Sequence, residues 1–302
     1  MREKTVNRLS APTFGWLDVN EARPLLPEKM ADQGESRLTL EEKRINEELK
    51  DEALITDNEV LYSKKLSLHV PKGVNAEYIQ RISYDNPHSL NVDIELEADA
   101  SLVFVQLIDS KEGVTFVNDV KITQLDSSKI SVIQLFQGEG KIYSNLFSGL
   151  SGNRAEFENS VAYHVLGNGV LDISLEALHT GRKTKSRIEY KGVLRDNANK
   201  IFRGTINFKK GASGAEGTEK EDVLILDDGV ENKTVPLILC DEEDVAGEHG
   251  ASIGRLPEDL VFYLSSRGLE TEEIYELMAD ARISALLKKV PGCEQPEVNM
   301  NE

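Results

Sequence analysis

The residues best suited to metal chemistry lie close together in one acidic stretch near the C-terminus. Cys240 ends an apolar run, four acidic residues follow at 241–244, and Glu248 and His249 come after three further residues. Thiolate and imidazole bind iron, copper and zinc, and carboxylates add oxygen ligands that suit iron. The spacing alone is a weak signal, because any acidic loop that holds a histidine would look similar. This stretch is nevertheless the strongest candidate for a working site.

No recognised catalytic motif accompanies these residues. The sequence has no GxSxG nucleophile elbow, no HExxH pair and no GxGxxG that opens a helix after a strand. The glycine-bearing stretch 211–220 breaks the spacing of a phosphate-binding loop and carries acids where phosphate would sit. His69, His88 and His164 are scattered, and a lone histidine on a strand-rich body is more often structural. We therefore expect a non-catalytic protein that does not hydrolyse ATP itself.

Composition limits the partners and the location. The 302 residues carry a formal charge of −18, and residues 216–259 hold 14 acidic against 3 basic residues, so nucleic acid is an unsuitable partner. That acidic segment is either a solvated face or a surface that attracts a metal ion or a basic partner. No apolar run reaches the length of a membrane span, and the two cysteines, Cys240 and Cys293, form no CxxC motif. We expect a soluble, cytoplasmic protein with reduced thiols.

The middle of the chain has the pattern of half-buried strands. From about residue 61 to residue 240, apolar and polar side chains alternate in short runs, clearest at 92–98 and 171–177. Similar runs occur at 102–108, 130–136, 187–194, 201–208 and 235–239, with no strong amphipathic helix between them. Such a chain forms a sandwich, a barrel or a solenoid. Asn-Gly and Asp-Gly hairpin signals are few, which favours a rung-by-rung solenoid over antiparallel meanders.

Both ends of the chain carry helical signals. One helix is predicted from about Leu40 to Lys50, capped by Thr39. A second begins at Pro257 and stops at Gly268, and a third runs from Thr271 toward Val290 with a wide apolar stripe. One side of that stripe packs on the protein's own β body, and the other is covered either internally or by a partner. The expected division is an N-terminal segment at 1–58, a β core at 59–255 and a C-terminal helical segment at 256–302.

Several sequence blocks resemble the SufB/SufD family of iron–sulfur cluster assembly scaffold proteins. The first three blocks are residues 11–20, the stretch from His179 to Tyr190-Lys-Gly-Val-Leu, and Ile201-Phe-Arg-Gly-Thr-Ile-Asn-Phe. They continue through Val223-Leu-Ile-Leu, Glu248-His-Gly-Ala-Ser-Ile-Gly and Leu260-Val-Phe-Tyr-Leu-Ser-Ser-Arg-Gly-Leu. Order and rough spacing agree from about residue 179 to residue 289, and more weakly upstream. The pair of C-terminal blocks is specific, because that combination is hard to obtain by chance.

The resemblance implies a right-handed parallel β-helix with short helical ends, which agrees with the solenoid favoured by the pattern. It also implies two partners: a SufC-type ATPase of the ABC class that docks on the C-terminal helices, and a SufB-type chain or a second copy of this one. ATP hydrolysis would then come from the partner. The cargo implied is a transient iron–sulfur cluster, and the sequence does not decide whether a flavin binds.

The resemblance also assigns residues. His249 corresponds to the histidine that SufD contributes to the cluster-assembly site, with Glu248 and Cys240 as neighbouring candidates and Cys240 as a second metal ligand. The SufB position of a cluster-ligating cysteine falls at or near Glu221, an acid here, which favours a SufD-like role. Residues expected to bind the ATPase are Leu260, Phe262, Tyr263, Leu264, Arg267, Gly268, Ile274, Leu277 and Met278.

Three other interpretations stay open at this stage. The N-terminal part is short for the family, which leaves room for a compact homodimeric SufB-like scaffold working with SufC alone. A β-helix carbohydrate-active enzyme could use acids such as Asp241 and Asp244, although 6% aromatic residues argue against sugar-stacking platforms. A metal-storage role for the acidic segment lacks the spaced ligands of a calcium loop.

Overall fold

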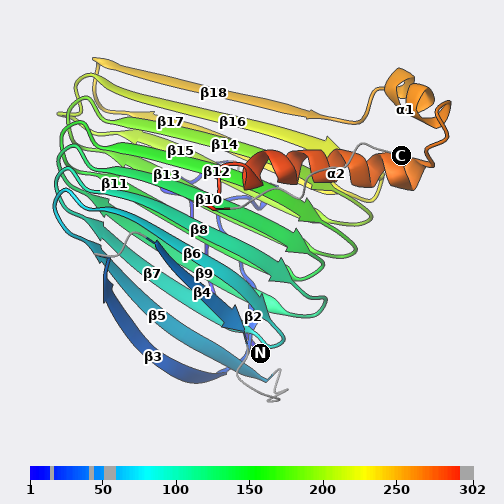
Figure 1. Cartoon of the computed structure of the whole chain (residues 1–302), viewed down its shortest axis with the longest axis horizontal. Helices are drawn as coiled ribbons and strands as arrows, with labels where there is room; N and C mark the ends of the chain where they lie inside the picture. Colours follow the sequence, from blue (N-terminus) through cyan, green and yellow to red (C-terminus); the bar gives the residue numbers. More distant parts are fainter. Residues whose placement is uncertain (14–16, 41–43, 51–58, 293–302) are drawn as a thin grey trace.

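The protein is a β-solenoid whose two walls are parallel sheets of eight strands each (Figure 1). The computed structural model describes residues 1–13, 17–40, 44–50 and 59–292. Successive strands alternate between the walls, so that even-numbered strands β4 to β18 form one sheet and odd-numbered strands β3 to β17 form the other. This confirms the β-helix predicted from the sequence.

The strand bounds are uniform over most of the chain. The odd wall consists of β3 (Lys29–Thr39), β5 (Val60–Val70), β7 (His88–Leu96), β9 (Thr115–Gln124), β11 (Lys141–Leu150), β13 (Val170–His179), β15 (Asn199–Phe208) and β17 (Glu231–Cys240). The even wall consists of β4 (Arg44–Lys50), β6 (Asn75–Tyr84), β8 (Ser101–Ser110), β10 (Lys129–Gly138), β12 (Glu156–Val165), β14 (Lys185–Leu194), β16 (Ala215–Ile225) and β18 (Val245–Gly254).

Alternation along each strand fills the interior. In β10, Ile130, Val132 and Phe136 point inward and are buried in the main core, whereas Ile133 and Leu135 face the outer surface. Because neighbouring parallel strands are in register, each inward residue stacks on its equivalents one rung away. The core is therefore a set of columns that run along the solenoid, and a residue's column follows from its register.

One inward column is polar rather than apolar. Gln106 donates to Gln80 at 3.0 Å, and Gln134 donates to Gln106 at 2.9 Å. Asn159, which lies in the neighbouring inward column over Val132, donates to Gln134 at 3.4 Å. Tyr190 continues the chain by donating its hydroxyl proton to Asn159 at 2.8 Å. Each amide both donates and accepts, so these buried groups are satisfied along the axis.

The corners of the rungs are also stacked. Asp99, Ser127, Arg154 and Lys183 adopt positive φ between 54° and 60° at equivalent turns. The backbone N–H of Ser127 donates to Asn153 O at 2.8 Å in the next rung, and Arg154 donates to Arg182 O in the same way. A left-handed residue at each corner costs some backbone energy, and the hydrogen bond to the following rung offsets it.

Two C-terminal helices follow the last strand. Helix α1 (Glu258–Ser265) projects beyond the solenoid, and α2 (Thr271–Leu287) folds back along the outer face of β10, β12 and β14 (Figure 1). Leu286 and Val290 pack on Ile133 and Ala162 of that face. No helix within the described part of the chain is long and apolar enough to cross a membrane.

The N-terminal residues cross the outer face of the odd wall. This N-terminal strap, residues 1–13 and 17–28, contains the small antiparallel pair β1 (Arg2–Glu3) and β2 (Leu25–Leu26). Leu9 and Val19 pack on Val235 of β17. Beneath the strap, fully buried Arg203 pairs with Asp172 and donates to the Val19 carbonyl, so the strap closes over an ion pair.

The structure corrects one predicted element. The helix expected from Leu40 to Lys50 is wrong over its last seven residues, because Arg44–Lys50 forms strand β4 and pairs in parallel with β6. Residues 41–43 of that prediction lie outside the described residues. Glu47 points inward there and accepts hydrogen bonds from Tyr78 and Gln80. Strands β3 and β4 already belong to the walls, so the solenoid begins before residue 59. The predicted strands and the two C-terminal helices are confirmed.

Candidate functional site

At the C-terminal end of the solenoid, no described strand covers the last rung. Strands β17 and β18 are the outermost strands of their sheets, so each presents one unpaired edge. Every residue of β18 except Val245 is exposed, and β17 is mostly half-buried. A row of free N–H and C=O groups on two adjacent walls is a template for pairing with another chain.

His249 lies on the inner side of this open end. It is in register with Glu219 of β16, two residues along from the pair Gly217 and Gly247. A Cβ on either glycine would contact interior side chains such as Phe208, which fixes that side of the strand as the inner one. By alternation His249 also faces inward, and Glu248 faces outward. The two neighbouring candidates therefore lie on opposite sides of β18.

Cys240 occupies a different part of the same rung. It is the last residue of β17, in register with Phe208, and its exposed Sγ donates to the Glu242 carbonyl at 2.9 Å. Four residues separate Cys240 from Val245, the first residue of β18. His249 lies about 13 Å beyond Val245 along that strand, at roughly 3.3 Å per residue. Both groups are at the open end, but the structure does not bring them together within one chain.

The acids that follow Cys240 serve mainly to hold the loop to the rung beneath it. Asp241 pairs with Lys209 at 3.1 Å, and Asp244 accepts from Ser213 at 2.7 Å. Glu242 accepts a hydrogen bond from the Gly211 N–H at 2.9 Å. This bond is the main cause of a lowered pKa of the Glu242 carboxyl, and further backbone hydrogen bonds add to it. The acidic run is therefore a set of loop contacts.

Glu221 is buried and fully engaged one rung inside the opening. Its carboxylate pairs with the equally buried Lys200, accepts from Thr234 at 2.6 Å and accepts from the Tyr163 hydroxyl at 3.1 Å. Burial lowers the pKa of Lys200, and the Glu221 carboxylate opposes that shift. The expected cluster-site position thus holds a structural ion pair that crosses from one wall to the other.

Glu219 is the buried acid that the sequence reasoning missed. Its side chain is 3% exposed and no hydrogen bond from a described residue reaches it, and burial raises its pKa to about 8, with the Glu221 charge adding to the rise. The carboxylate extends across the interior, because a Cβ added to Gly204 on the opposite wall would collide with its Oε2. Alternation along β16 gives its inward direction, but nothing in the sequence reveals that Gly204 makes room for it.

Metal ligation within one chain is limited. Among the described residues, no group of three or more His, Cys, Asp or Glu side chains converges as a metal site. Cys240 and His249 remain accessible donors on the open rung. A cluster held there would need further ligands from inorganic sulfide or from a second chain.

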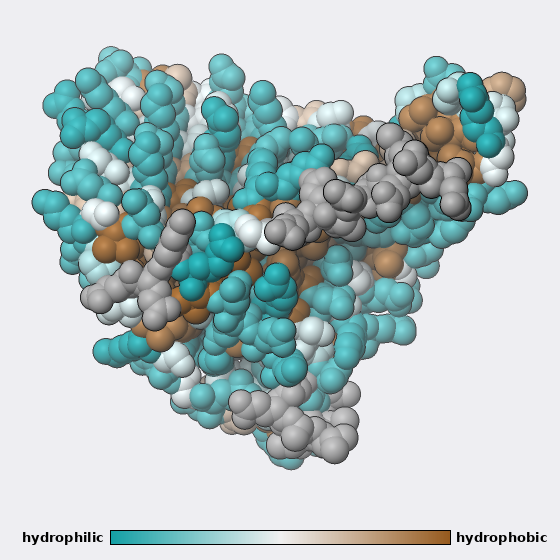
Figure 2. Space-filling model, viewed as in Figure 1, coloured by the Kyte–Doolittle hydropathy of each residue, from teal (hydrophilic) through white to brown (hydrophobic). Residues whose placement is uncertain are grey.

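The residues expected to bind an ATPase divide into two sets. Phe262, Tyr263 and Leu277 are 76%, 52% and 48% exposed, and no residue of α1 is buried. Ile274 is buried, and Met278 packs near Val193 and Leu224 of the solenoid. Apolar side chains gather visibly over α1 at the upper right of Figure 2. The remaining predicted residues are Leu260 and Leu264, which are half-buried, Arg267, which lies over the Tyr263 ring, and Gly268, which has φ +95°.

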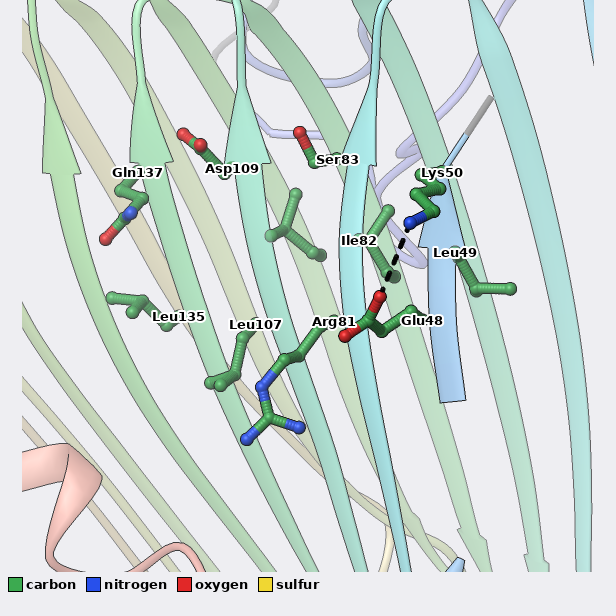
Figure 3. Close-up of a pocket in the computed structure, with 11 residues that line it drawn as sticks. Glu48, Leu49, Lys50, Arg81, Ile82, Ser83, Leu107, Asp109, Leu135 and Gln137 are labelled. Atoms are coloured by element: carbon green, nitrogen blue, oxygen red, sulfur yellow. Dashed lines mark ion pairs between the residues drawn. The ribbon is translucent and has the colours of Figure 1, made fainter. Parts of the chain in front are cut away.

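A separate groove lies on the outer face of β4, β6, β8 and β10. It encloses about 290 Å³ and is lined by Leu107 and Leu135, and Arg81 lies between Leu107 and the ion pair of Glu48 with Lys50 (Figure 3). None of the expected site residues lines it. It is an apolar surface feature away from the open end.

These observations define a class: a parallel β-solenoid that presents a thiol and an imidazole on an open edge, with an exposed apolar helix beside it. A family model described as the SUF system FeS cluster assembly SufBD core domain matches residues 53–282. The chain therefore belongs to the SufBD family, and the resemblance noted in the sequence is confirmed.

The similar proteins carry related names. The chain is 27% identical over 193 residues to the iron–sulfur cluster assembly protein SufD of Bacillus subtilis, covering 64% of this chain and 44% of that protein. It is 30% identical over 140 residues to a SufBD family protein of Staphylococcus saprophyticus, covering 46% and 30% respectively. The matches thus span less than half of those relatives' length.

Proposed function

We propose that this chain is a SufD-like scaffold subunit of a SUF-type iron–sulfur cluster assembly complex, working in the cytoplasm without catalytic activity of its own. The observation that carries the proposal is the open rung, where unpaired edges of both walls surround accessible His249 and Cys240. A second chain paired on those edges would bring the additional ligands that one chain lacks. The transient cluster is then cargo held between two chains.

The second element of the proposal is an ABC-type ATPase that docks on α1. Phe262 and Tyr263 are large, exposed and adjacent. Aromatic side chains that become buried when a partner binds often dominate the energy of protein interfaces. Helix α2 anchors α1 to the solenoid, because Arg195 pairs with Glu272 at 2.7 Å and with Glu276 at 3.0 Å. A docked ATPase would therefore be coupled to the walls through α2.

Co-purification tests the ATPase partner. The chain is co-expressed with a SufC-type ATPase, and we expect Phe262→Asp to weaken capture about tenfold or more, as loss of a central anchor does. Met30→Asp is the matched control, because Met30 is 65% exposed on β3 at the far end of the solenoid. Equal capture of the ATPase by both variants and the unchanged chain would remove α1 from the interface.

The partner at the open rung is either a SufB-type chain or a second copy of this one. The homodimeric alternative has an observation in its favour, since each chain offers two unpaired edges to a copy of itself. Sedimentation of the chain alone and with a SufB-type chain separates the two. A stable homodimer that excludes the SufB-type chain would replace the SufD-like role with the compact homodimeric scaffold.

A further inference from the structure

The buried acid Glu219 receives no hydrogen bond from a described residue, and the Lys200 ammonium acts on it only as a neighbouring charge. Below it in the same inward column lie Ile188, Asn159 and Val132, so its nearest inward neighbour along the wall is apolar. Burial of a carboxyl group without a hydrogen bond is unfavourable, whereas an apolar side chain at this position would add to the core. Glu221, two residues away, shows the contrast, because three partners satisfy it.

The position of Glu219 connects it to the open rung. His249 stands directly over it in register on β18, and neighbouring strands of a sheet are about 4.8 Å apart. Both side chains point inward, so a carboxylate and an imidazole share one column at the opening. Gly204 on the facing wall supplies the space that the Glu219 carboxylate occupies.

We propose that Glu219 and His249 form a divalent-cation site, in which Glu219 is the inner oxygen ligand and His249 the outer nitrogen ligand. A mixed imidazole and carboxylate donor set suits ferrous iron among the first-row metals. The identity of the cation as iron rests on the proposed function, whereas the pairing of the two ligands rests on register and burial. The remaining coordination positions face the opening, where sulfide, water or a partner chain can enter.

This assignment changes which carboxylate serves the site. Glu221 is held by Lys200 and Thr234 and would have to leave an ion pair to reach a metal. Glu219 needs to break no hydrogen bond with a described residue. Glu248 faces the other side of β18 and is not part of this pair.

Cobalt titration of the purified full-length chain tests the pair, because Co²⁺ replaces Fe²⁺ in air and gains visible absorption on coordination. We expect Glu219→Gln and His249→Ala each to weaken Co²⁺ binding about tenfold or more, as loss of one of two protein ligands does. Glu216→Gln is the matched control on the same strand, since Glu216 is exposed and pairs outward with Lys185. Gly204→Ala retains the acid but displaces its carboxylate, and should weaken binding as well.

The outcomes separate this inference from the proposed function. Co²⁺ binding by Glu219→Gln equal to that of the unchanged chain overturns the pair, as does failure of the unchanged chain to bind Co²⁺ at all. Circular dichroism of each variant distinguishes a lost ligand from a lost fold. A chain that captures the ATPase but shows no Glu219-dependent binding refutes only the cation site. Glu219-dependent binding without ATPase capture refutes only the proposed docking.

Discussion

The substitution Glu219→Gln should change the pH dependence of stability in a defined direction. Burial raises the pKa of the Glu219 carboxyl from its ordinary value of 4.5 to about 8. Between these values the unfolded chain has released a proton that the folded chain still holds, so stability falls as pH rises. The loss is absent below the unfolded pKa and complete above the folded one.

The magnitude follows from the width of that interval. Each pH unit costs about 1.4 kcal/mol, so the full interval corresponds to an upper limit of about 5 kcal/mol. Glutamine has nearly the same shape and does not ionise, which removes this term. Relative to the unchanged chain, Glu219→Gln should therefore gain about 4 kcal/mol of unfolding free energy between about pH 5 and pH 8.

Urea unfolding of both proteins at the two pH values measures this difference. Titrating groups that do not interact with Glu219 cancel in the comparison, whereas Glu221 and Lys200, which do interact with it, contribute to the difference. Because solenoids can open from one end, amide hydrogen exchange in β14 and β16 should show the same trend locally. A stability difference that stays constant between the two pH values would mean that the folded chain ionises Glu219 as readily as the unfolded chain. Burial would then not raise the pKa of Glu219.

Three further predictions concern the body of the solenoid. Burial lowers the pKa of His179 to about 4. The contribution of the neutral imidazole to stability should therefore be full above about pH 6.5 and fall by up to about 3 kcal/mol toward pH 4. Urea melts in acid should show this loss in the unchanged chain and not in His179→Gln. Gly192→Ala would place a methyl group within the Tyr163 ring and should lower the unfolding free energy by about 2 kcal/mol or more in urea melts. The control Gly250→Ala meets open space and should lower the unfolding free energy less. Arg203→Ala leaves the buried Asp172 carboxylate without its cation, with only Asn7 still donating to it, and should cost about 3 to 5 kcal/mol by thermal unfolding. An unchanged melting temperature would show that this ion pair does not stabilise the fold.

The walls could be predicted from sequence because their evidence is local. Alternation at 92–98 and 171–177 reflects one buried face per strand, and it holds wherever a rung repeats. The segment 44–50 was misjudged because Ile45, Glu47 and Leu49 alternate over only seven residues, while a good cap and acidic first turn precede them. Pairing with β6 overrides the helix signal, and that partner lies about thirty residues away.

The site could be predicted only in part, for the same reason. The inward direction of Glu219 and Glu221 follows from the pattern of β16, and His249 follows from the resemblance. What separates the two acids is not local: Lys200 and Thr234 on the other wall satisfy one of them, and Gly204 only makes room for the other. Such contacts depend on which rungs face each other across the interior, which the period of a strand does not specify.

Helix α2 connects α1 to the middle of the solenoid, in addition to the direct connection of α1 to the edge strand β18. Its ion pairs reach the turn after β14 through Arg195 and β16 through Asp222, and Lys289, just after the helix, pairs with Glu189 of β14. The apolar side of α2 packs on β10 and β12. A pull on α1 would therefore be shared between β18, which residues 255–257 join to α1, and the several rungs that α2 contacts. Hydrogen-bonded strands resist shear far better than unzipping, so the load that α2 takes up reduces the tendency of the rung that carries His249 to fray.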